Sequence, residues 1–237
     1  MKNKIIVVLM LFVGICLVTG CSHSDEKLSD ALKFKKEYEK LNGTKREKDG
    51  KTVRSIQIPE DNPFIYKEAE DIVNMMKEKK TFVVYFGFAD CPWCRSVLPT
   101  FIEVAEDLDL DKIYYVDISN IRDVLSVAED GSVETDTQGS KGYYQLLKLL
   151  DSVLEDYTLT DSDGNDIATG EKRIFAPNVV SVVKGEAKVL EDGIGEKLTD
   201  PYMKLTDEIK EDTYNKFKCS IKCVLESKNT CSTKKSC

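Results

Sequence analysis

The apolar positions of this chain follow two spacings, which indicate where strands and helices form. Strict alternation at 53–58 and short apolar runs at 81–86, 113–116, 173–183 and 187–190 predict strands. Apolar residues three and four positions apart predict helices, at 63–79, 92–108, 146–154 and 201–225. Asn62 and Pro63 supply an N-cap and a first-turn proline for the first of these helices.

The order of these elements favours an α/β fold. From 53 to 116 strands and helices alternate as β-α-β-α-β, which calls for a mostly parallel central sheet with helices on its faces. The stretch 119–172 has a different predicted pattern of elements. Asp130-Gly131 and the segment 161–166 predict hairpin turns on either side of a helix. A Ca²⁺ loop at 161–166 is excluded, since Asp166 stands where the sharp-turn glycine belongs.

Composition limits what such a chain can do. Its 237 residues are 41% apolar and 32% charged, which fits one globular domain with attachments. Lys and Arg number 34 against 42 Asp and Glu, and the resulting net charge of −8 argues against a nucleic-acid partner. The single histidine, His23, leaves little scope for metal hydrolases or His-dependent triads.

The first residues predict export. Lys2 and Lys4 precede a short apolar run, the pattern of a signal peptide. The segment 17–21 (LVTGC) resembles the lipobox of bacterial lipoproteins, and the resemblance implies cleavage before Cys21 and lipid on its thiol. An ordinary signal peptide or an uncleaved anchor is the alternative. Each of the three puts the chain outside the cytoplasm, and the lipobox puts it on the extracytoplasmic face of the bacterial cell membrane.

Export changes how the cysteines are interpreted. Cys16 leaves with the signal segment and Cys21 carries lipid, so an even number of thiols remains. Disulfides persist in that compartment. Four of these thiols are expected to form structural disulfides in one of three pairings, with a second redox relay or a four-cysteine metal site as alternatives: Cys219, Cys223, Cys231 and Cys237.

The other two thiols form the motif CPWC, Cys91-Pro92-Trp93-Cys94, where a buried strand turns into a helix. The first turn of a helix has unpaired N–H groups and the positive end of its dipole, which stabilise a thiolate. Cys94 is close enough to resolve a mixed disulfide on Cys91. Pro92 loses no hydrogen bond there, and we expect Trp93 to lie partly exposed, offering an apolar contact to a protein substrate.

Three segments together resemble the thioredoxin family: 81–101 (TFVVYFGFADCPWCRSVLPTF), 113–117 (IYYVD) and 175–183 (FAPNVVSVV). The closest likeness is to the bacteriocin transport accessory proteins and their lipoprotein relatives. The resemblance implies a central mixed sheet flanked by helices, with a helix-plus-hairpin insertion at about 119–172 before the cis-proline strand. It divides the chain into a signal peptide (1–20), a polar tether with a helical stretch (21–50), a thioredoxin-like domain (51–226) and a cysteine-bearing tail (227–237).

The family also implies roles for matching positions. Cys91 is the attacking thiol, Cys94 the resolving thiol and Pro177 the cis-proline, while the backbone of Ala176 pairs with an extended substrate. The implied activity is thiol–disulfide exchange on a protein or peptide disulfide, with no dissociable cofactor and no metal. A monomer served by a membrane electron donor is expected. Reductases, oxidases and isomerases share the motif and differ in reduction potential.

The chain departs from the family where thioredoxins place a buried acid, six residues before the first cysteine, because Tyr85 stands there. Asp90 is expected to raise the pKa of Cys91, while Arg95 and the helix N-terminus are expected to lower it. We expect the lowering effects to prevail.

Other functions fit the same residues. Cys91 and Cys94 are also compatible with a structural disulfide, or with a zinc site shared with the tail cysteines. The competing function from another class is a non-catalytic binding lipoprotein, which keeps the fold and holds a protein or peptide partner.

Overall fold

The computed structural model describes residues 29–226 of the chain. The expected signal segment, the lipidation residue Cys21 and the tail cysteines Cys231 and Cys237 lie outside the described residues. The described helices are α1 (Asp30–Glu39), α2 (Ala69–Lys77), α3 (Pro92–Asp107), α4 (Lys141–Leu150) and α5 (Asp207–Leu225). The described strands are β1 (Phe64–Tyr66), β2 (Phe82–Gly87), β3 (Ile113–Asp117), β4 (Val124–Val127), β5 (Val133–Thr137), β6 (Asp156–Thr160), β7 (Asp166–Lys172), β8 (Asn178–Val183) and β9 (Glu186–Glu191).

A mixed sheet with the strand order β1-β3-β2-β8-β9 forms the centre of the molecule. Strands β1 and β2 both pair with β3 in parallel, whereas β8 pairs antiparallel with β2 and with β9. Helices α2 and α3 connect the parallel strands, because a parallel neighbour can be reached only through a crossover. The protein is therefore an α/β protein whose mixed sheet is flanked by helices.

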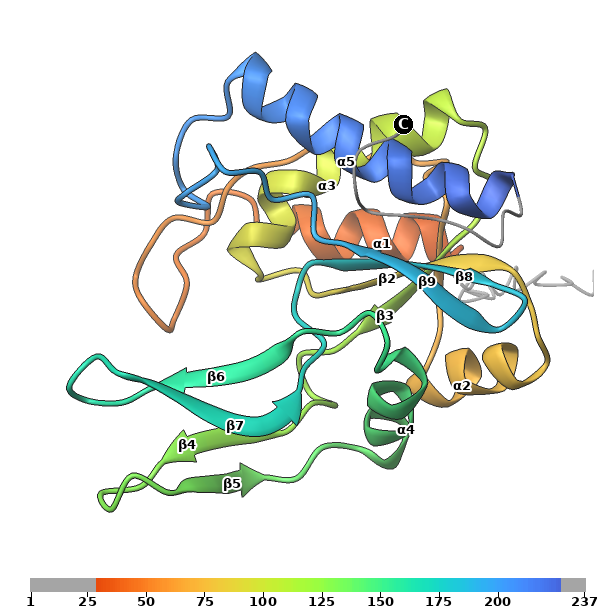
Figure 1. Ribbon diagram of the computed structural model, residues 1–237. Helices are drawn as coiled ribbons and strands as arrows, with labels where there is room; N and C mark the ends of the chain where they lie inside the picture. The colour runs from red at the N-terminus through yellow and green to blue at the C-terminus, as the bar shows by residue number, and fades with distance from the viewer. Residues whose placement is uncertain (1–28, 227–237) are drawn as a thin grey trace, which may run out of the picture.

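The two faces of the sheet carry separate hydrophobic clusters. Helices α1, α3 and α5 cover one face, and α2 and α4 cover the other (Figure 1). Side chains of β2 alternate between them, so Val83 and Tyr85 lie with α1 and α3 while Val84 and Phe86 lie with α2. Burial on both faces is what the apolar run of β2 predicts. The alternation puts Tyr85 on the same face as Cys94.

The prediction of a strand at 53–58 is wrong, because the structure has no strand there. Ile56 and Ile58 are buried, as the alternation requires, but their backbone groups pair with side chains instead of a strand. The Asn42 side chain bonds both the N–H and the carbonyl of Ile56, and the Glu39 carboxylate accepts the N–H of Ile58. The alternation of apolar and polar residues correctly predicts which positions are buried. It does not show which groups bond with the backbone of this segment.

The helix predicted at 63–79 begins later than expected. Residues 64–66 form β1, because they pair in parallel with β3 and thereby complete the edge of the sheet. The helix then starts at Ala69, behind a capping box in which the Glu68 and Asp71 side chains bond each other's backbone N–H groups. Asn62 and Pro63 therefore precede a strand and do not cap a helix.

Two other helices also have different limits. The helix predicted at 146–154 starts earlier, with Ser140 as its N-cap, and ends at Leu150. The helix predicted from Pro201 begins at Asp207, because the Thr206 side chain accepts a first-turn N–H and caps it.

Helix α1 is the helical stretch predicted within 21–50, but it packs into the core and is not part of a tether. Phe34 and Tyr38 are fully buried, and the Phe34 ring stacks on Phe64 and meets Tyr115 edge-on. The other faces of α1 are polar. A helix with one narrow aromatic stripe has the composition of a solvated segment, which is why the pattern favours a tether.

The segment 119–172 contains a helix between two hairpins, as its turn signals predict. Strand β4 pairs with β5 and β6 with β7, each pair forming its own small sheet beside the central one (Figure 1). An ion pair of 2.5 Å between Arg173 Nη1 and Asp123 Oδ1, both nearly buried, joins the two ends of the segment. Within residues 29–226, no helix has the length and hydrophobicity that a bilayer crossing needs.

Candidate active site

Cys91 is the N-cap residue of α3. Its sulfur accepts a hydrogen bond of 3.1 Å from the backbone N–H of Cys94. Pro92 occupies the first turn, where its missing N–H leaves no bond unmade. No acidic residue lies in that turn. The helix therefore presents an N–H and the positive end of its dipole to the Cys91 sulfur, an arrangement that stabilises an anion.

The cis-proline expected from the family resemblance is present, and it lies beside Cys91. The Ala176–Pro177 peptide bond is cis. Strand β8 pairs with β2 so that Asn178 faces Phe86, and this register brings the start of β8 to the end of β2. The Cys91 thiol donates a hydrogen bond of 3.3 Å to the carbonyl oxygen of Ala176. The structure thus brings together the predicted sulfur and the predicted backbone group.

Both cysteines of the motif are free thiols, and both are buried. Burial, followed by the neighbouring Cys91 sulfur, raises the pKa of the Cys94 thiol. Cys91 exposes only 2% of its surface. Pro92, Trp93 and Ala176 around it are partly exposed, as expected for Trp93. The Cys91 sulfur is therefore covered in this conformation.

The three residues expected to shift the pKa of the thiols differ in their burial and in their contacts. Tyr85 is buried in the same cluster as Cys94, and its interaction with the Cys94 thiol lowers the pKa of that thiol, against the larger raising effect of burial. Asp90 is half-exposed, and its Oδ1 accepts a bond of 3.2 Å from Arg46 Nε. Arg95 is buried and donates to the backbone carbonyls of Tyr38, Arg54 and Ala89 and to the Asn42 side chain. Arg95 thus ties α3 to α1 and to the loop before the motif.

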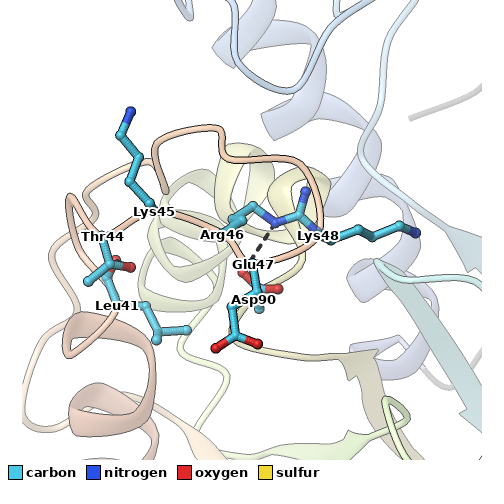
Figure 2. A pocket seen from close by; sticks show the side chains of 7 residues that line it. All are labelled: Leu41, Thr44, Lys45, Arg46, Glu47, Lys48 and Asp90. Atoms are coloured by element: carbon cyan, nitrogen blue, oxygen red, sulfur yellow. Dashed lines mark hydrogen bonds and ion pairs between the residues drawn. The ribbon is translucent and has the colours of Figure 1, made fainter.

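A hollow lies beside Asp90 (Figure 2). The loop after α1 forms its other wall, with the lining residues Leu41, Thr44, Lys45, Arg46, Glu47, Lys48 and Asp90. Three of these carry positive charge and two carry negative charge, and Arg46 is paired with Asp90, so the lining is of mixed sign. The sequence gives little sign of it, because the loop falls in the segment assigned to the tether.

Arg122 is a further cation near Cys91, and the sequence interpretation missed it. It follows β3, and its guanidinium lies 5.4 Å from the centre of the Phe88 ring. Burial lowers the pKa of Arg122, whereas its interaction with Cys91 acts in the opposite direction. The carboxyl ends of the parallel strands β2 and β3 share one edge of the sheet, which is the signal that could have located it.

The cysteines of α5 are separate from this site. Cys219 and Cys223 are both disulfide-bonded. Cys231 and Cys237 lie outside the described residues, so the predicted pairing stays a prediction. Among residues 29–226, no group of three or more His, Cys, Asp or Glu side chains is arranged to hold a metal ion.

No protein-family model matches the chain, and no curated protein matches it. The functional conclusion therefore depends on the geometry of Cys91, Cys94 and the Ala176–Pro177 bond.

Proposed function

We propose that the chain is a thiol–disulfide oxidoreductase with a thioredoxin-like fold, acting on disulfides in proteins or peptides. One observation carries the proposal: the Cys91 sulfur contacts the N–H of Cys94 at the start of α3 and the Ala176 carbonyl before the cis-proline. A sulfur placed there can be held as a thiolate while an extended substrate pairs with the Ala176 backbone. The mixed sheet supports the fold proposal, with 119–172 as an insertion before the cis-proline strand.

The proposed cycle has two exchange steps. The Cys91 thiolate attacks one sulfur of a substrate disulfide, which forms a mixed disulfide and releases the other sulfur as a thiolate. Cys94 loses its proton and attacks the Cys91 sulfur, so the Cys91–Cys94 disulfide forms and the second substrate sulfur leaves and takes up a proton. The substrate gains two electrons and the dithiol loses two. The oxidising direction is the reverse, and no dissociable cofactor takes part.

A non-catalytic binding lipoprotein is the competing function, and the burial of Cys91 favours it. A sulfur that exposes 2% of its surface is covered in this conformation. In the proposed enzyme, docking of a peptide along Ala176 moves Trp93 aside and uncovers the sulfur. In a binding module the cover stays in place and the dithiol does not turn over.

Reduction of insulin by dithiothreitol separates these functions. The protein should accelerate the precipitation of insulin chains, because each turnover transfers electrons from dithiothreitol through the Cys91–Cys94 pair. Rates that are equal with and without the protein would favour the binding module.

We further propose that the protein is a monomer anchored by lipid to the extracytoplasmic face of a bacterial membrane, where a membrane protein exchanges electrons with it. The proposal rests on the lipobox-like ending at Cys21. Cys21→Ala should move the protein from the membrane pellet to the soluble or secreted fraction, as measured by immunoblot of fractionated cells. A Cys16→Ala variant is the matched control, since that cysteine precedes the cleavage point. Retention of both variants in the pellet would contradict lipidation.

A further inference from the structure

Three buried tyrosines fill the space between the CPWC motif and helix α1. Tyr85, Tyr38 and Tyr115 come from β2, α1 and β3, and each exposes at most 1% of its surface. The rings of Tyr85 and Tyr115 are stacked, with centres 5.7 Å apart. Burial raises the pKa of Tyr85, Tyr38 and Tyr115, so all three hydroxyls are protonated at neutral pH.

These side chains form a row of neighbouring groups, here called the tyrosine chain. Its first member, Tyr85, lies in the same buried cluster as Cys94 and interacts with its thiol. The hydroxyl oxygens of Tyr85 and Tyr38 lie 3.4 Å apart, and the Tyr38 ring meets the Tyr115 ring edge-on, with centres 6.3 Å apart. Tyr115 donates to Oε1 of Glu37 at 3.4 Å. The row therefore runs from a fully buried thiol to a carboxylate.

Glu37 lies where the tyrosine chain approaches solvent. It belongs to α1 and is partly exposed. Its other oxygen, Oε2, accepts a hydrogen bond of 2.5 Å from the hydroxyl of Tyr66. A carboxylate in this position can take a proton from Tyr115 and pass it to water.

The proposed reaction creates a need for such a route. Cys94 has no exposed surface, and burial raises the pKa of its thiol, so at neutral pH it holds its proton out of contact with bulk solvent. It attacks the mixed disulfide only as a thiolate. The family's buried acid is replaced by Tyr85, whose hydroxyl accepts a proton only if it passes its own to another group.

Resting on the proposed oxidoreductase function, we propose that the tyrosine chain conducts the proton of Cys94 to Glu37 while the mixed disulfide is resolved. The thiol proton passes to Tyr85, the Tyr85 proton to Tyr38, the Tyr38 proton to Tyr115 and the Tyr115 proton to Glu37. Each hydroxyl ends neutral. The Cys94 sulfur, now a thiolate, forms its bond to Cys91, and the substrate sulfur leaves and takes a proton from water. Proton and charge balance without any further reactant.

Charged groups from every neighbouring element act on this path. Cys91 faces Cys94 from the start of α3, and the Arg95 guanidinium lies 5.9 Å from the centre of the Tyr38 ring. Two further carboxylates and one more phenol surround the far end: Asp117 from β3, Asp30 from α1, and Tyr66 from β1. Arg95 favours a transient negative charge on Tyr38, whereas the carboxylates draw the proton toward the Glu37 end.

Stopped-flow reaction of the reduced protein with 5,5′-dithiobis-(2-nitrobenzoate) resolves the two steps. The Cys91 attack releases a first equivalent of thionitrobenzoate, and resolution by Cys94 releases a second. Tyr85→Phe should slow the second phase by about a hundredfold, the scale of a lost proton-transfer partner, and leave the first within about twofold. Tyr38→Phe, Tyr115→Phe and Glu37→Gln should slow the same phase. In each variant that phase should become steeply pH-dependent, because loss of the Cys94 proton then requires an opening of the site that admits hydroxide.

The matched control is Tyr143→Phe, which removes a buried hydroxyl on the opposite face of the sheet. It should change neither phase nor the pH profile. Two normal phases in the tyrosine variants, with the wild-type pH profile, would overturn the relay and leave the oxidoreductase intact. Equal slowing of both phases would assign the tyrosines a structural role, and that result would also overturn the proton relay. If the wild type releases no first equivalent, the oxidoreductase itself fails.

Discussion

Replacing Cys91 with serine should reduce the rate of insulin reduction to that of dithiothreitol alone. The Cys91 sulfur is the one that contacts both the start of α3 and the Ala176 carbonyl, so it is the sulfur that a bound substrate meets. A serine hydroxyl keeps nearly the same volume and accepts the same N–H, but it does not form a disulfide. The loss of activity would therefore come from chemistry and not from misfolding. Insulin turbidity measures the activity, and circular dichroism confirms the fold.

Cys94→Ser provides the contrast that identifies the attacking sulfur. In this variant the first step is intact and the second is impossible, so a mixed disulfide between Cys91 and the substrate should accumulate. Non-reducing electrophoresis detects it as a species of higher mass that reductant removes. If Cys91→Ser traps the substrate and Cys94→Ser does not, the two roles are reversed. If neither variant lowers the rate below that of the wild type, the dithiol is not the catalyst.

The sequence predicts the parts of the fold in which burial is continuous along the chain. Strands β2 and β3 are found where their apolar runs indicate, and the hairpin turns are found at their glycines. The strand predicted at 173–183 is shorter than expected, since β8 begins at Asn178, directly after the cis Ala176–Pro177 bond. The segment 53–58 shows the limit of this approach. Its apolar residues are buried as predicted, yet the partners of its backbone are the side chains of Asn42 and Glu39. Such partners leave no trace in a local pattern.

The residues of the candidate site also fall into those that the sequence predicts and those that it does not. Cys91, Cys94 and Pro177 belong to recognisable motifs, so their meeting could be predicted before the structure was known. The tyrosine chain could not, because its members come from three elements with no common spacing. Arg95 also has contacts that its place in the sequence does not reveal. A charge next to a cysteine suggests an effect on the pKa of the thiol, and in the structure the guanidinium also donates to the carbonyls of Tyr38 in α1 and of Ala89 before the motif.

Helix α1 connects these findings. It contributes Tyr38 and Glu37 to the tyrosine chain, and the loop that follows it forms the hollow beside Asp90. The segment expected to be a polar tether with a helical stretch therefore contributes one buried tyrosine to the core below the dithiol and a charged loop beside Asp90. Whatever holds α1 on the sheet also holds these groups in place, and Arg95 of α3 donates to the Tyr38 carbonyl in α1 and to the Asn42 side chain just after it.

Arg95→Met should lower the free energy of unfolding by about 3–4 kcal/mol, because it leaves several buried acceptors without a donor. The methionine fills most of the volume, so the loss reports hydrogen bonds and not a cavity. The Tyr38, Arg54 and Ala89 carbonyls lose their partner. Removal of a buried charge offsets part of the cost, since burial lowers the pKa of Arg95 and thus disfavours its charged form. Urea denaturation followed by circular dichroism measures the change.

Arg95→Lys is the informative control for this prediction. Lysine keeps the charge but replaces the planar fork with a single ammonium, which reaches fewer of these carbonyls at once. We therefore expect its stability to fall between those of the wild type and Arg95→Met. Loss of α1 from the sheet should also slow resolution by Cys94, because Tyr38 and Glu37 move away with the helix. A loss of less than about 0.5 kcal/mol in Arg95→Met, the scale of an ordinary surface change, would show that the other contacts of α1 hold it in place without Arg95.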